Sequence, residues 1–245
     1  MSFTTCADGH VKKVMSEGER AMASDGAIEG VVFDLDGTLY DKRPVERWVL
    51  TRMLPALPRL WRYTKVRTGL AGVDFDDAGA LARETLQRLA SDDRGQESWR
   101  RWISDSYEPQ VLRAVERAGR AYPGVAEVLL RLRAGGLRLG LVSDYRGAHD
   151  RLRALGIDPA LFHFSLVTEE HGAMKPAARM AARTLAGMGL PGERMVMVGD
   201  RAFADQRFAE TCGMRFFGVL AGGDPPDPAW TSWPGVRARL SALLR

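Results

Sequence analysis

Five short apolar runs, separated by stretches with helical spacing, constrain the fold of this chain more than any other feature. The runs lie at 30–38, 137–144, 164–170, 194–200 and 215–220 and are rich in Val, Leu, Met and Phe. Continuous apolar strands that alternate with helices are typical of a parallel sheet buried on both faces. The intervening stretches, such as VAEVLLRLRAGG and RGAHDRLRALG, end at glycine, which commonly terminates helices. The pattern therefore predicts an α/β fold with a doubly wound parallel sheet.

The connection after the first predicted strand is far longer than the ~2–6 residues that are usual at such a place. Residues 41–120 contain no strand-like run, only helical stretches rich in Arg, Leu, Trp and Ala. We therefore expect an all-helical cap at 41–120, inserted into a core formed by 29–40 and 121–245, with an N-terminal tail at 1–28. Four tryptophans are expected to pack between the cap helices: Trp48, Trp61, Trp99 and Trp102.

Towards the end of the chain, residues 222–235 are rich in glycine and proline and predict a loop, which a short helix follows.

Composition limits the class of protein. At 245 residues and 45% hydrophobic content, the chain can bury a sizeable core. Its two cysteines, Cys6 and Cys212, lie far apart, which argues against a disulfide framework, and Cys212 is expected to be a buried, inert thiol. No apolar stretch has the length of a signal-peptide core or a membrane span, so we expect a cytoplasmic protein without a membrane partner. The net charge of +4 is compatible with anionic partners, but no nucleic-acid motif is present.

Polar residues end four of the five predicted strands. In open α/β sheets, ligands bind beyond the carboxyl ends of the strands. The side chains that such ends bring to a common edge are those of Asp34, Asp36, Ser143, Asp144, Lys175 and Asp200. Converging carboxylates raise one another's pKa unless a cation lies among them. Oxygen ligands that leave room for water and phosphate favour Mg²⁺, whereas the cysteines and histidines lack the spacing of a zinc site.

The motifs FDLDGTLY, LVSD, GAMKP and VGDRAFAD, in this order between residues 30 and 220, resemble those of the haloacid dehalogenase (HAD) superfamily of phosphohydrolases. The resemblance implies a Rossmann-like core with an inserted cap. It also implies that Asp34 is a nucleophile, which forms an aspartyl-phosphate, and that Asp36 is the general acid/base.

The same resemblance assigns the other candidate residues. Ser143 matches the hydroxyl that holds a phosphoryl oxygen, and Lys175 the ammonium that offsets negative charge. The implied Mg²⁺ ligands are Asp34, the main-chain carbonyl of Asp36, Asp200 and, in support, Asp205. The implied substrate-binding set is Gly37, Thr38, Ser143, Asp144 and Lys175, although Asp144 also suits a helix cap or a loop. Arg201 departs from the family pattern, which commonly has a small hydroxyl residue there, and could crowd or recharge the metal site.

Taken singly, these residues have ordinary explanations: Ser143 could be a helix cap and Lys175 a solvated side chain. Together they favour a Mg²⁺-dependent phosphatase of a small phosphomonoester. A sugar phosphomutase of the same superfamily, or a non-catalytic relative that binds phosphate ligands or a protein, stays open. A dehalogenase is disfavoured, because carbon–halogen displacement does not need the proton donor Asp36.

Two further features leave alternatives open. Residues 43–67 carry seven basic side chains and a single acid. They form either a solvated helix face, or a surface from which one or two arginines select an additional anionic group of the substrate. Glu169 and Glu170 either orient Lys175 or face water.

Overall fold

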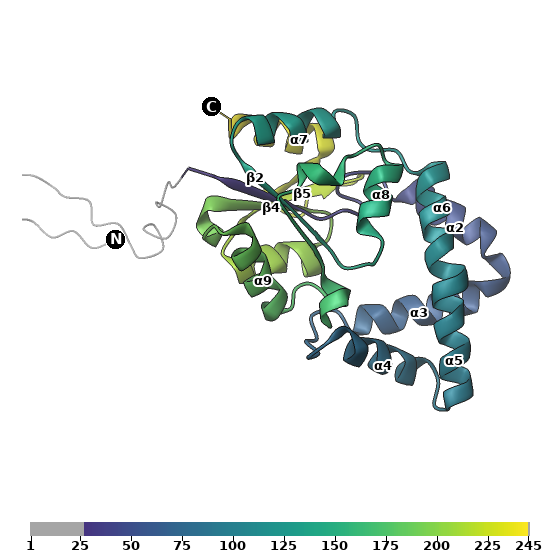
Figure 1. The fold of residues 1–245 in the computed structure, drawn as a ribbon. Helices are drawn as coiled ribbons and strands as arrows, with labels where there is room; N and C mark the ends of the chain where they lie inside the picture. Colours follow the sequence, from purple (N-terminus) through teal and green to yellow (C-terminus); the bar gives the residue numbers. More distant parts are fainter. Residues whose placement is uncertain (1–26, 245) are drawn as a thin grey trace, which may run out of the picture.

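The computed structural model of the protein describes residues 27–244. Six parallel strands form one sheet in the order β3-β2-β1-β4-β5-β6. Figure 1 shows this sheet with helices on either side of it. Their bounds are β1 Gly30–Phe33, β2 Arg138–Ser143, β3 Phe164–Val167, β4 Met195–Gly199, β5 Arg215–Leu220 and β6 Trp230–Ser232. The chain starts in the middle of the sheet and extends it in both directions, which confirms the predicted doubly wound α/β fold. Most of the predicted N-terminal tail, with Cys6, lies outside the described residues.

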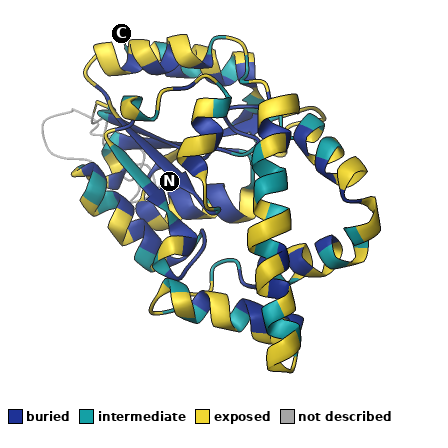
Figure 2. Cartoon of the chain, turned by 45° about the vertical axis from the view of Figure 1, so that its right-hand side comes forward, coloured by how far each residue is buried: buried dark blue, intermediate teal, exposed yellow. Residues whose placement is uncertain are grey.

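The central strand β1 is buried on both faces. Val31, Val32 and Phe33 have no exposed surface, and alternate side chains enter two different apolar layers. Val31 and Phe33 belong to one layer and Val32 to the other. Outside the segment between β1 and β2, the helices that contribute to these layers are α7 (Val125–Ala134), α8 (Ala148–Ala154) and α11 (Trp233–Ala242) in the first, and α9 (Ala178–Met188) and α10 (Arg207–Cys212) in the second. Figure 2 shows the buried strands between helices whose outer sides are exposed.

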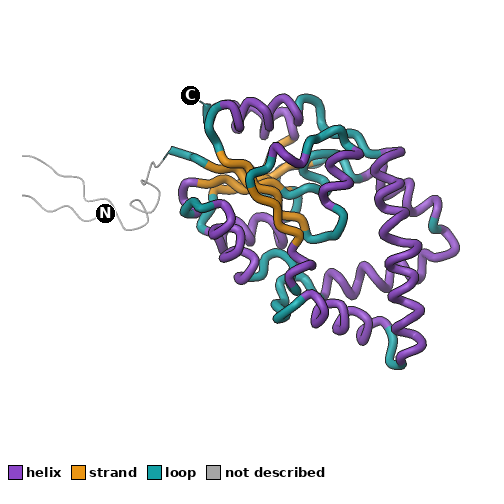
Figure 3. The backbone as a smooth tube through the Cα atoms, viewed as in Figure 1, coloured by secondary structure: helices purple, strands orange, loops and turns teal. Residues whose placement is uncertain are grey.

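A helical insert separates β1 from β2. Its helices are α2 (Arg43–Arg52), α3 (Leu57–Gly69), α4 (Ala78–Leu89), α5 (Asp93–Arg101) and α6 (Glu108–Ala118), with a 3₁₀ turn, η1 (Leu54–Ala56), and a π-helical turn, η2 (Trp102–Tyr107). Figure 3 shows this part of the chain as helices beside the strands of the core. Tyr40 and Ala121 form an antiparallel bridge, so the chain leaves the core and returns to it at adjacent points.

Local sequence explains how the insert helices begin and what holds them together. Asp77 and Asp92 precede α4 and α5, and each side chain accepts a hydrogen bond from the backbone N–H three residues later. The aromatic rings of Trp99 and Trp102 are buried and meet edge to face, as predicted for insert packing. The same prediction is wrong for Trp61, which is 66% exposed and has Lys65 over its ring.

The structure also corrects the predicted strands. A sixth strand, β6, lies within the predicted loop 222–235 and pairs with β5. This strand has three residues and follows a stretch rich in glycine and proline, so its sequence shows no apolar pattern that would predict a strand. β1 ends at Phe33 rather than at residue 38, and β3 ends at Val167, where the 3₁₀ turn η4 (Thr168–His171) follows.

Three further short helical turns complete the described chain: η3 (Pro159–Leu161), η5 (Gly192–Arg194) and the π-helical η6 (Ala202–Gln206). Cys212, at the end of α10, is a buried free thiol, and burial raises its pKa to about 12, which agrees with the predicted inert role. Over residues 27–244, the helices are too short or too polar to cross a bilayer.

Candidate active site

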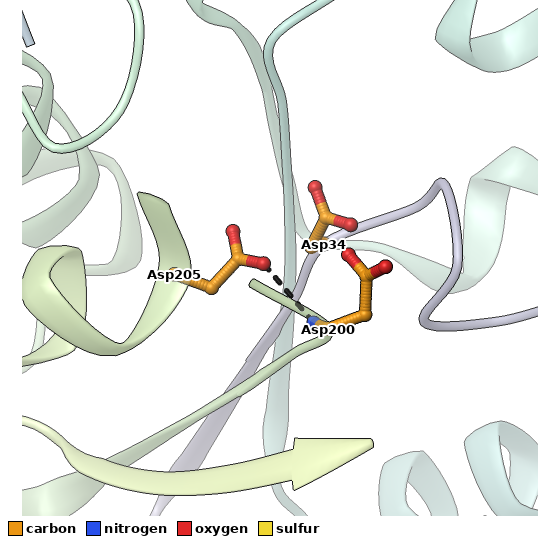
Figure 4. A group of neighbouring side chains, drawn as sticks. All are labelled: Asp34, Asp200 and Asp205. Carbon is orange, nitrogen blue, oxygen red and sulfur yellow. Dashed lines mark hydrogen bonds between the residues drawn. The ribbon is translucent and has the colours of Figure 1, made fainter. Parts of the chain in front are cut away.

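Three carboxylates meet at the carboxyl edge of the sheet. Asp34 follows β1 directly, and its N–H continues the strand pairing by donating to the carbonyl of Val198 (2.9 Å). Asp200 follows β4, and Asp205 lies in η6. One oxygen of each carboxylate lies within 4.8 Å of the others (Figure 4). The predicted convergence of the first and fourth strand ends is therefore present.

Two glycines make this approach possible. Gly37 has a φ of +93°, and a Cβ at this position would collide with the carboxylate of Asp200. A Cβ on Gly199 would collide with the side chain of Asp205. The sequences DGT and GD are therefore required by the geometry of the site as well as by its chemistry.

Lys175 lies between Asp34 and Asp205 and is fully buried. Its ammonium donates to Oδ1 of Asp34 (2.6 Å), to Oδ1 of Asp205 (2.6 Å) and to the carbonyl of Val142 (3.0 Å). Burial alone would lower the pKa of Lys175, but the nearby carboxylates of Asp205 and Asp34 outweigh it and raise the pKa. All three ammonium hydrogens have acceptors, so Lys175 is a fixed positive charge.

Asp34 is held in its anionic form. Burial alone would raise its pKa, but the charges of Lys175 and Arg201 outweigh burial and lower the pKa below its usual value. The hydroxyl of Thr38 donates to Oδ2 of Asp34 (3.0 Å), while Lys175 occupies the other oxygen. Asp34 is therefore a positioned carboxylate with the charge state that a nucleophile needs.

Asp200 shows that the cluster fits a cation. Its Oδ2 accepts a hydrogen bond from Lys42, whereas its Oδ1 is buried without a hydrogen-bond partner. Burial and the charge of Asp34 raise the pKa of Asp200 to about 7, although Lys42 opposes the shift. A buried carboxylate oxygen without a donor, beside two further carboxylates, suits a hard divalent cation with oxygen ligands.

Asp205 fixes the loop that carries Asp200. Its Oδ2 accepts the backbone N–H groups of Asp200 and Arg201, each at 3.0 Å, and Figure 4 draws the first of these bonds. Because its Oδ1 accepts from Lys175, both oxygens of Asp205 have partners. The side chain of Asp205 therefore fixes the backbone at Asp200 and Arg201.

Asp36 lies outside this cluster and has different partners from Asp34. Its Oδ1 accepts the hydroxyl of Tyr40 (2.5 Å), and its Oδ2 accepts Nη1 of Arg151. Arg151 projects from α8, and Tyr40 precedes the insert. The candidate general acid/base is thus held between the core and the start of the insert.

Sequence reasoning missed the roles of Tyr40, Lys42 and Arg151. A signal for Arg151 was available, because it shares the buried face of α8 with Ala148 and Leu152 at helical spacing. A charged residue on such a face indicates a buried partner. No comparable signal identifies Lys42, whose partner Asp200 is 158 residues away.

Ser143 is the last residue of β2, and Asp144 follows it into the site. Ser143 is fully buried, and its hydroxyl lies 3.4 Å from Nη2 of Arg151. Asp144 is a loop residue; its carboxylate accepts the hydroxyl of Thr168 (2.8 Å), the backbone N–H of Lys175 (2.8 Å) and Nη2 of Arg201 (2.7 Å). The side chain of Asp144 therefore joins three loops of the site.

Arg201 and Glu169 depart from ordinary surface roles. Arg201 Nε lies 3.9 Å from Oδ1 of Asp200, so a positive charge does stand beside the acidic cluster, as its position predicted. Glu169 accepts Arg67 from α3 and the backbone N–H of Arg146 (2.6 Å). The expectation that Glu169 orients Lys175 or faces water is wrong, whereas Glu170 is exposed.

Comparison with known proteins identifies relatives of this chain. A family model described as a haloacid dehalogenase-like hydrolase matches residues 28–213. A glyceraldehyde 3-phosphate phosphatase of Methanocaldococcus jannaschii is 28% identical over 80% of this chain and 86% of its own. An (S)-2-haloacid dehalogenase of Pseudomonas putida is 30% identical over 72% and 78%, respectively. The crystal structure of an HAD phosphatase from Thermococcus onnurineus has a TM-score of 0.64 at 20% identity, over 87% of this chain and 98% of that chain, a likeness of fold.

Proposed function

Because the chain belongs to the haloacid dehalogenase-like hydrolase family, we propose that it is a Mg²⁺-dependent phosphohydrolase of small phosphomonoesters. The proposed reaction passes through an aspartyl-phosphate on Asp34. The observation that carries the proposal is the state of Asp34: a buried carboxylate with a lowered pKa, fixed by Lys175 and adjacent to the unpartnered oxygen of Asp200. Nucleophile, charge compensation and a cation-binding oxygen are thus close together.

The residues that would hold Mg²⁺ are Asp34, Asp200 and the main-chain carbonyl of Asp36, with Asp205 in support. Bound Mg²⁺ would offset the negative charge of the carboxylates and of the phosphoryl oxygens. The donor set consists of oxygens alone, which suits this ion.

In the first step, an oxygen of Asp34 attacks phosphorus and the bond from phosphorus to the leaving oxygen breaks. Asp36, in its protonated form, gives its proton to that leaving oxygen. Lys175 stays beside Asp34 as a fixed positive charge, which keeps the nucleophile anionic. Gly37, Thr38 and Ser143 are the proposed partners of the phosphoryl oxygens.

In the second step, water attacks the phosphorus of the aspartyl-phosphate. Asp36, now a carboxylate, takes a proton from this water, and the bond between Asp34 and phosphorus breaks. Inorganic phosphate leaves, and both aspartates return to their starting states. One carboxyl group therefore serves as acid and then as base, and the two steps divide a difficult displacement into easier ones.

We further propose that the helical insert acts as a cap that excludes water and contributes to substrate choice. Among its seven basic residues between 43 and 67, only Arg67 is buried, and it is bound to Glu169 in η4. Because the charge of Arg67 is compensated by Glu169, we propose that one or two of the other arginines in this stretch select a second anionic group. Equal kcat/KM for neutral and acidic phosphomonoesters would remove that role. The reaction needs no oxidising compartment, which suits the proposed cytoplasmic location.

Three alternatives to a phosphohydrolase can be told apart from it by experiment. A phosphomutase would use the same two aspartates but would return the phosphoryl group to the substrate, and it would depend on a bisphosphate activator. A dehalogenase would not need the proton donor Asp36. A non-catalytic relative would bind phosphate ligands without turnover, and its binding would be insensitive to Asp34→Asn.

The test is release of inorganic phosphate from a panel of sugar phosphates, nucleotides, phosphoglycolate and phosphorylated acids. We expect turnover of at least one ester with Mg²⁺, without a bisphosphate, and loss of turnover with a chelator. Asp34→Asn removes the nucleophile and is expected to lower kcat at least ~10³-fold.

The matched control is Asp150→Asn, which makes the same chemical change at an exposed position on α8. Asp150→Asn should retain the wild-type rate. Circular dichroism checks that Asp34→Asn is folded. Activity of Asp34→Asn near that of Asp150→Asn would refute the aspartyl-phosphate route.

A further inference from the structure

We infer that Arg151 is a positioning residue for proton transfer by Asp36. It fixes the carboxylate from the core side, while Tyr40 fixes it from the side of the insert. The inference rests on the proposed function, in which Asp36 is the general acid/base, and it adds a residue from outside the four motifs.

The contacts of Arg151 combine two parts of the site. Nη1 donates to Oδ2 of Asp36, and Nη2 lies 3.4 Å from the hydroxyl of Ser143. Nη2 also donates to the carbonyls of Tyr145 (2.9 Å) and Arg146 (3.3 Å), in the loop that joins β2 to α8. One guanidinium therefore links the candidate acid/base to the loop that carries the candidate phosphate-binding hydroxyl.

Burial makes this arrangement rigid. The side chain of Arg151 is 5% exposed, and it is held at its base by the buried face of α8. Burial alone would lower its pKa, but Asp36 and Tyr40 outweigh burial and raise it, so Arg151 stays charged. A buried guanidinium without Asp36 would be an uncompensated charge, so each group requires the other.

The two donors on Asp36 have a consequence for its chemistry. A guanidinium has no acceptor atom, so Arg151 cannot receive a proton from Asp36. Both carboxylate oxygens already accept hydrogen bonds, one from Tyr40 and one from Arg151. Each oxygen of Asp36 has a second lone-pair site, so the carboxyl group can carry a proton towards the leaving oxygen while Arg151 and Tyr40 hold its orientation. With Arg151 absent, one of these two anchors is lost.

Tyr40 connects the same carboxylate to the insert. It forms the bridge to Ala121 where the chain leaves and rejoins the core. Of the two anchors of Asp36, Tyr40 therefore sits where a movement of the insert would act, whereas Arg151 belongs to the core. Tyr40 thus joins Asp36 to the segment that enters the insert, whereas Arg151 joins it to α8 and the β2–α8 loop.

Leaving groups of different basicity separate this role from a merely structural one. An alkoxide needs a proton as it leaves, whereas p-nitrophenolate leaves without one. The ratio kcat/KM includes events only through the first irreversible step, formation of the aspartyl-phosphate. A defect in proton donation therefore lowers kcat/KM for an alkyl phosphate and spares p-nitrophenyl phosphate.

The experiment compares Arg151→Gln and Arg151→Lys with the wild type on p-nitrophenyl phosphate and on the best alkyl phosphomonoester of the substrate panel. We expect Arg151→Gln to lower kcat/KM for the alkyl ester about tenfold more than for p-nitrophenyl phosphate. Arg151→Lys should recover part of the difference because it retains the charge. Asp36→Asn, which removes the proton donor, sets the largest difference expected between the two esters. Arg153→Gln changes an exposed neighbour on α8 and should leave kcat/KM unchanged for both esters.

If Arg151→Gln lowers kcat/KM equally for both esters, or for neither, the positioning role is overturned. The proposed function would still stand in that case, because the wild type is active. If Arg151→Gln does not fold, the same criterion is applied to Arg151→Lys, which retains a charged partner for Asp36. A wild type that hydrolyses no phosphomonoester at all would refute the proposed function, and this inference with it.

Discussion

At the scale of single residues, the site contains more carboxylates than positively charged side chains that bind them directly. Lys175 serves both Asp34 and Asp205, and the result is asymmetric. The pKa of Asp34 is lowered, whereas burial keeps the pKa of Asp205 above its usual value. Asp200 accepts a hydrogen bond from Lys42 on one oxygen, while its other oxygen has no hydrogen-bond donor and lies 3.9 Å from Nε of Arg201. The unbalanced charge is thus concentrated where a metal ion would bind.

The raised pKa of Asp200 predicts how cation binding depends on pH. The metal-free carboxyl has a pKa of about 7, so below that pH it is mostly protonated and a cation must displace the proton. Affinity for Mg²⁺ should therefore fall as pH falls, by about tenfold per unit well below pH 7. Titration calorimetry at pH 6 and pH 8, in buffers of different ionisation enthalpy, measures both the affinity and the proton released.

Asp200→Asn should remove both the proton release and most of the affinity. Asp76→Asn, an exposed change on the insert, should leave both unchanged. Mg²⁺ affinity that is constant between pH 6 and pH 8 would show that Asp200 is not protonated in the metal-free site.

At the scale of secondary-structure elements, one buried ion pair joins the insert to the core. Arg67 of α3 donates to Glu169 in η4, directly after β3, and both side chains are largely buried. Glu169 also accepts the N–H of Arg146 from the β2–α8 loop (2.6 Å). The position of α3 is therefore coupled to two loops that border the site.

Removal of one partner of this pair should destabilise the fold. Arg67→Met leaves Glu169 as a buried charge with weaker compensation and is expected to cost about 3–5 kcal/mol of the free energy of unfolding. Urea denaturation measures the cost. Arg62→Met makes the same change at an exposed position of α3 and should stay within about 0.5 kcal/mol of the wild type.

The double variant Arg67→Met/Glu169→Gln separates charge from packing. Because it leaves no buried charge, it should be more stable than Arg67→Met alone. Equal stability of Arg67→Met and Arg62→Met would contradict the structural importance of the pair.

Elements differ in how far sequence predicts them. Continuous apolar segments indicated β1 to β5, and consecutive stretches with helical spacing indicated the insert. β6 was not predicted because a strand of three residues is too short to show an alternating pattern. Trp61 was wrongly predicted to be packed because helical spacing does not show which face of a helix contacts another helix. The π-helical turn η2 within the insert likewise has no sequence signal of its own.

At the scale of the whole molecule, the cluster couples metal binding to stability. Its carboxylates come from segments separated by more than 160 residues of sequence, so a bound cation would join them only in the folded state. Mg²⁺ should therefore stabilise the protein by about 2.7 kcal/mol at 100 times its dissociation constant. This corresponds to a rise in Tm of about 5–10 °C.

Thermal unfolding in increasing Mg²⁺, with NaCl at matched ionic strength as control, measures this rise. Asp200→Asn should lose most of it, and excess chelator should return the wild type to its metal-free Tm. The same rise in Tm for Asp200→Asn and for the wild type would place the bound cation elsewhere.

By itself, the sequence determined the parallel α/β core, the helical nature of the insert, the strand ends at which Asp34, Ser143 and Asp200 lie, and the motif that carries Lys175, because apolar periodicity and short motifs are local properties. Only the tertiary structure decided which cation meets which carboxylate. Lys42 meets Asp200, Arg67 meets Glu169 and Arg151 meets Asp36 across sequence separations of 158, 102 and 115 residues. Such pairs depend on how helices and loops pack in three dimensions, since the strength of an ion pair is set by distance and burial rather than by separation along the chain.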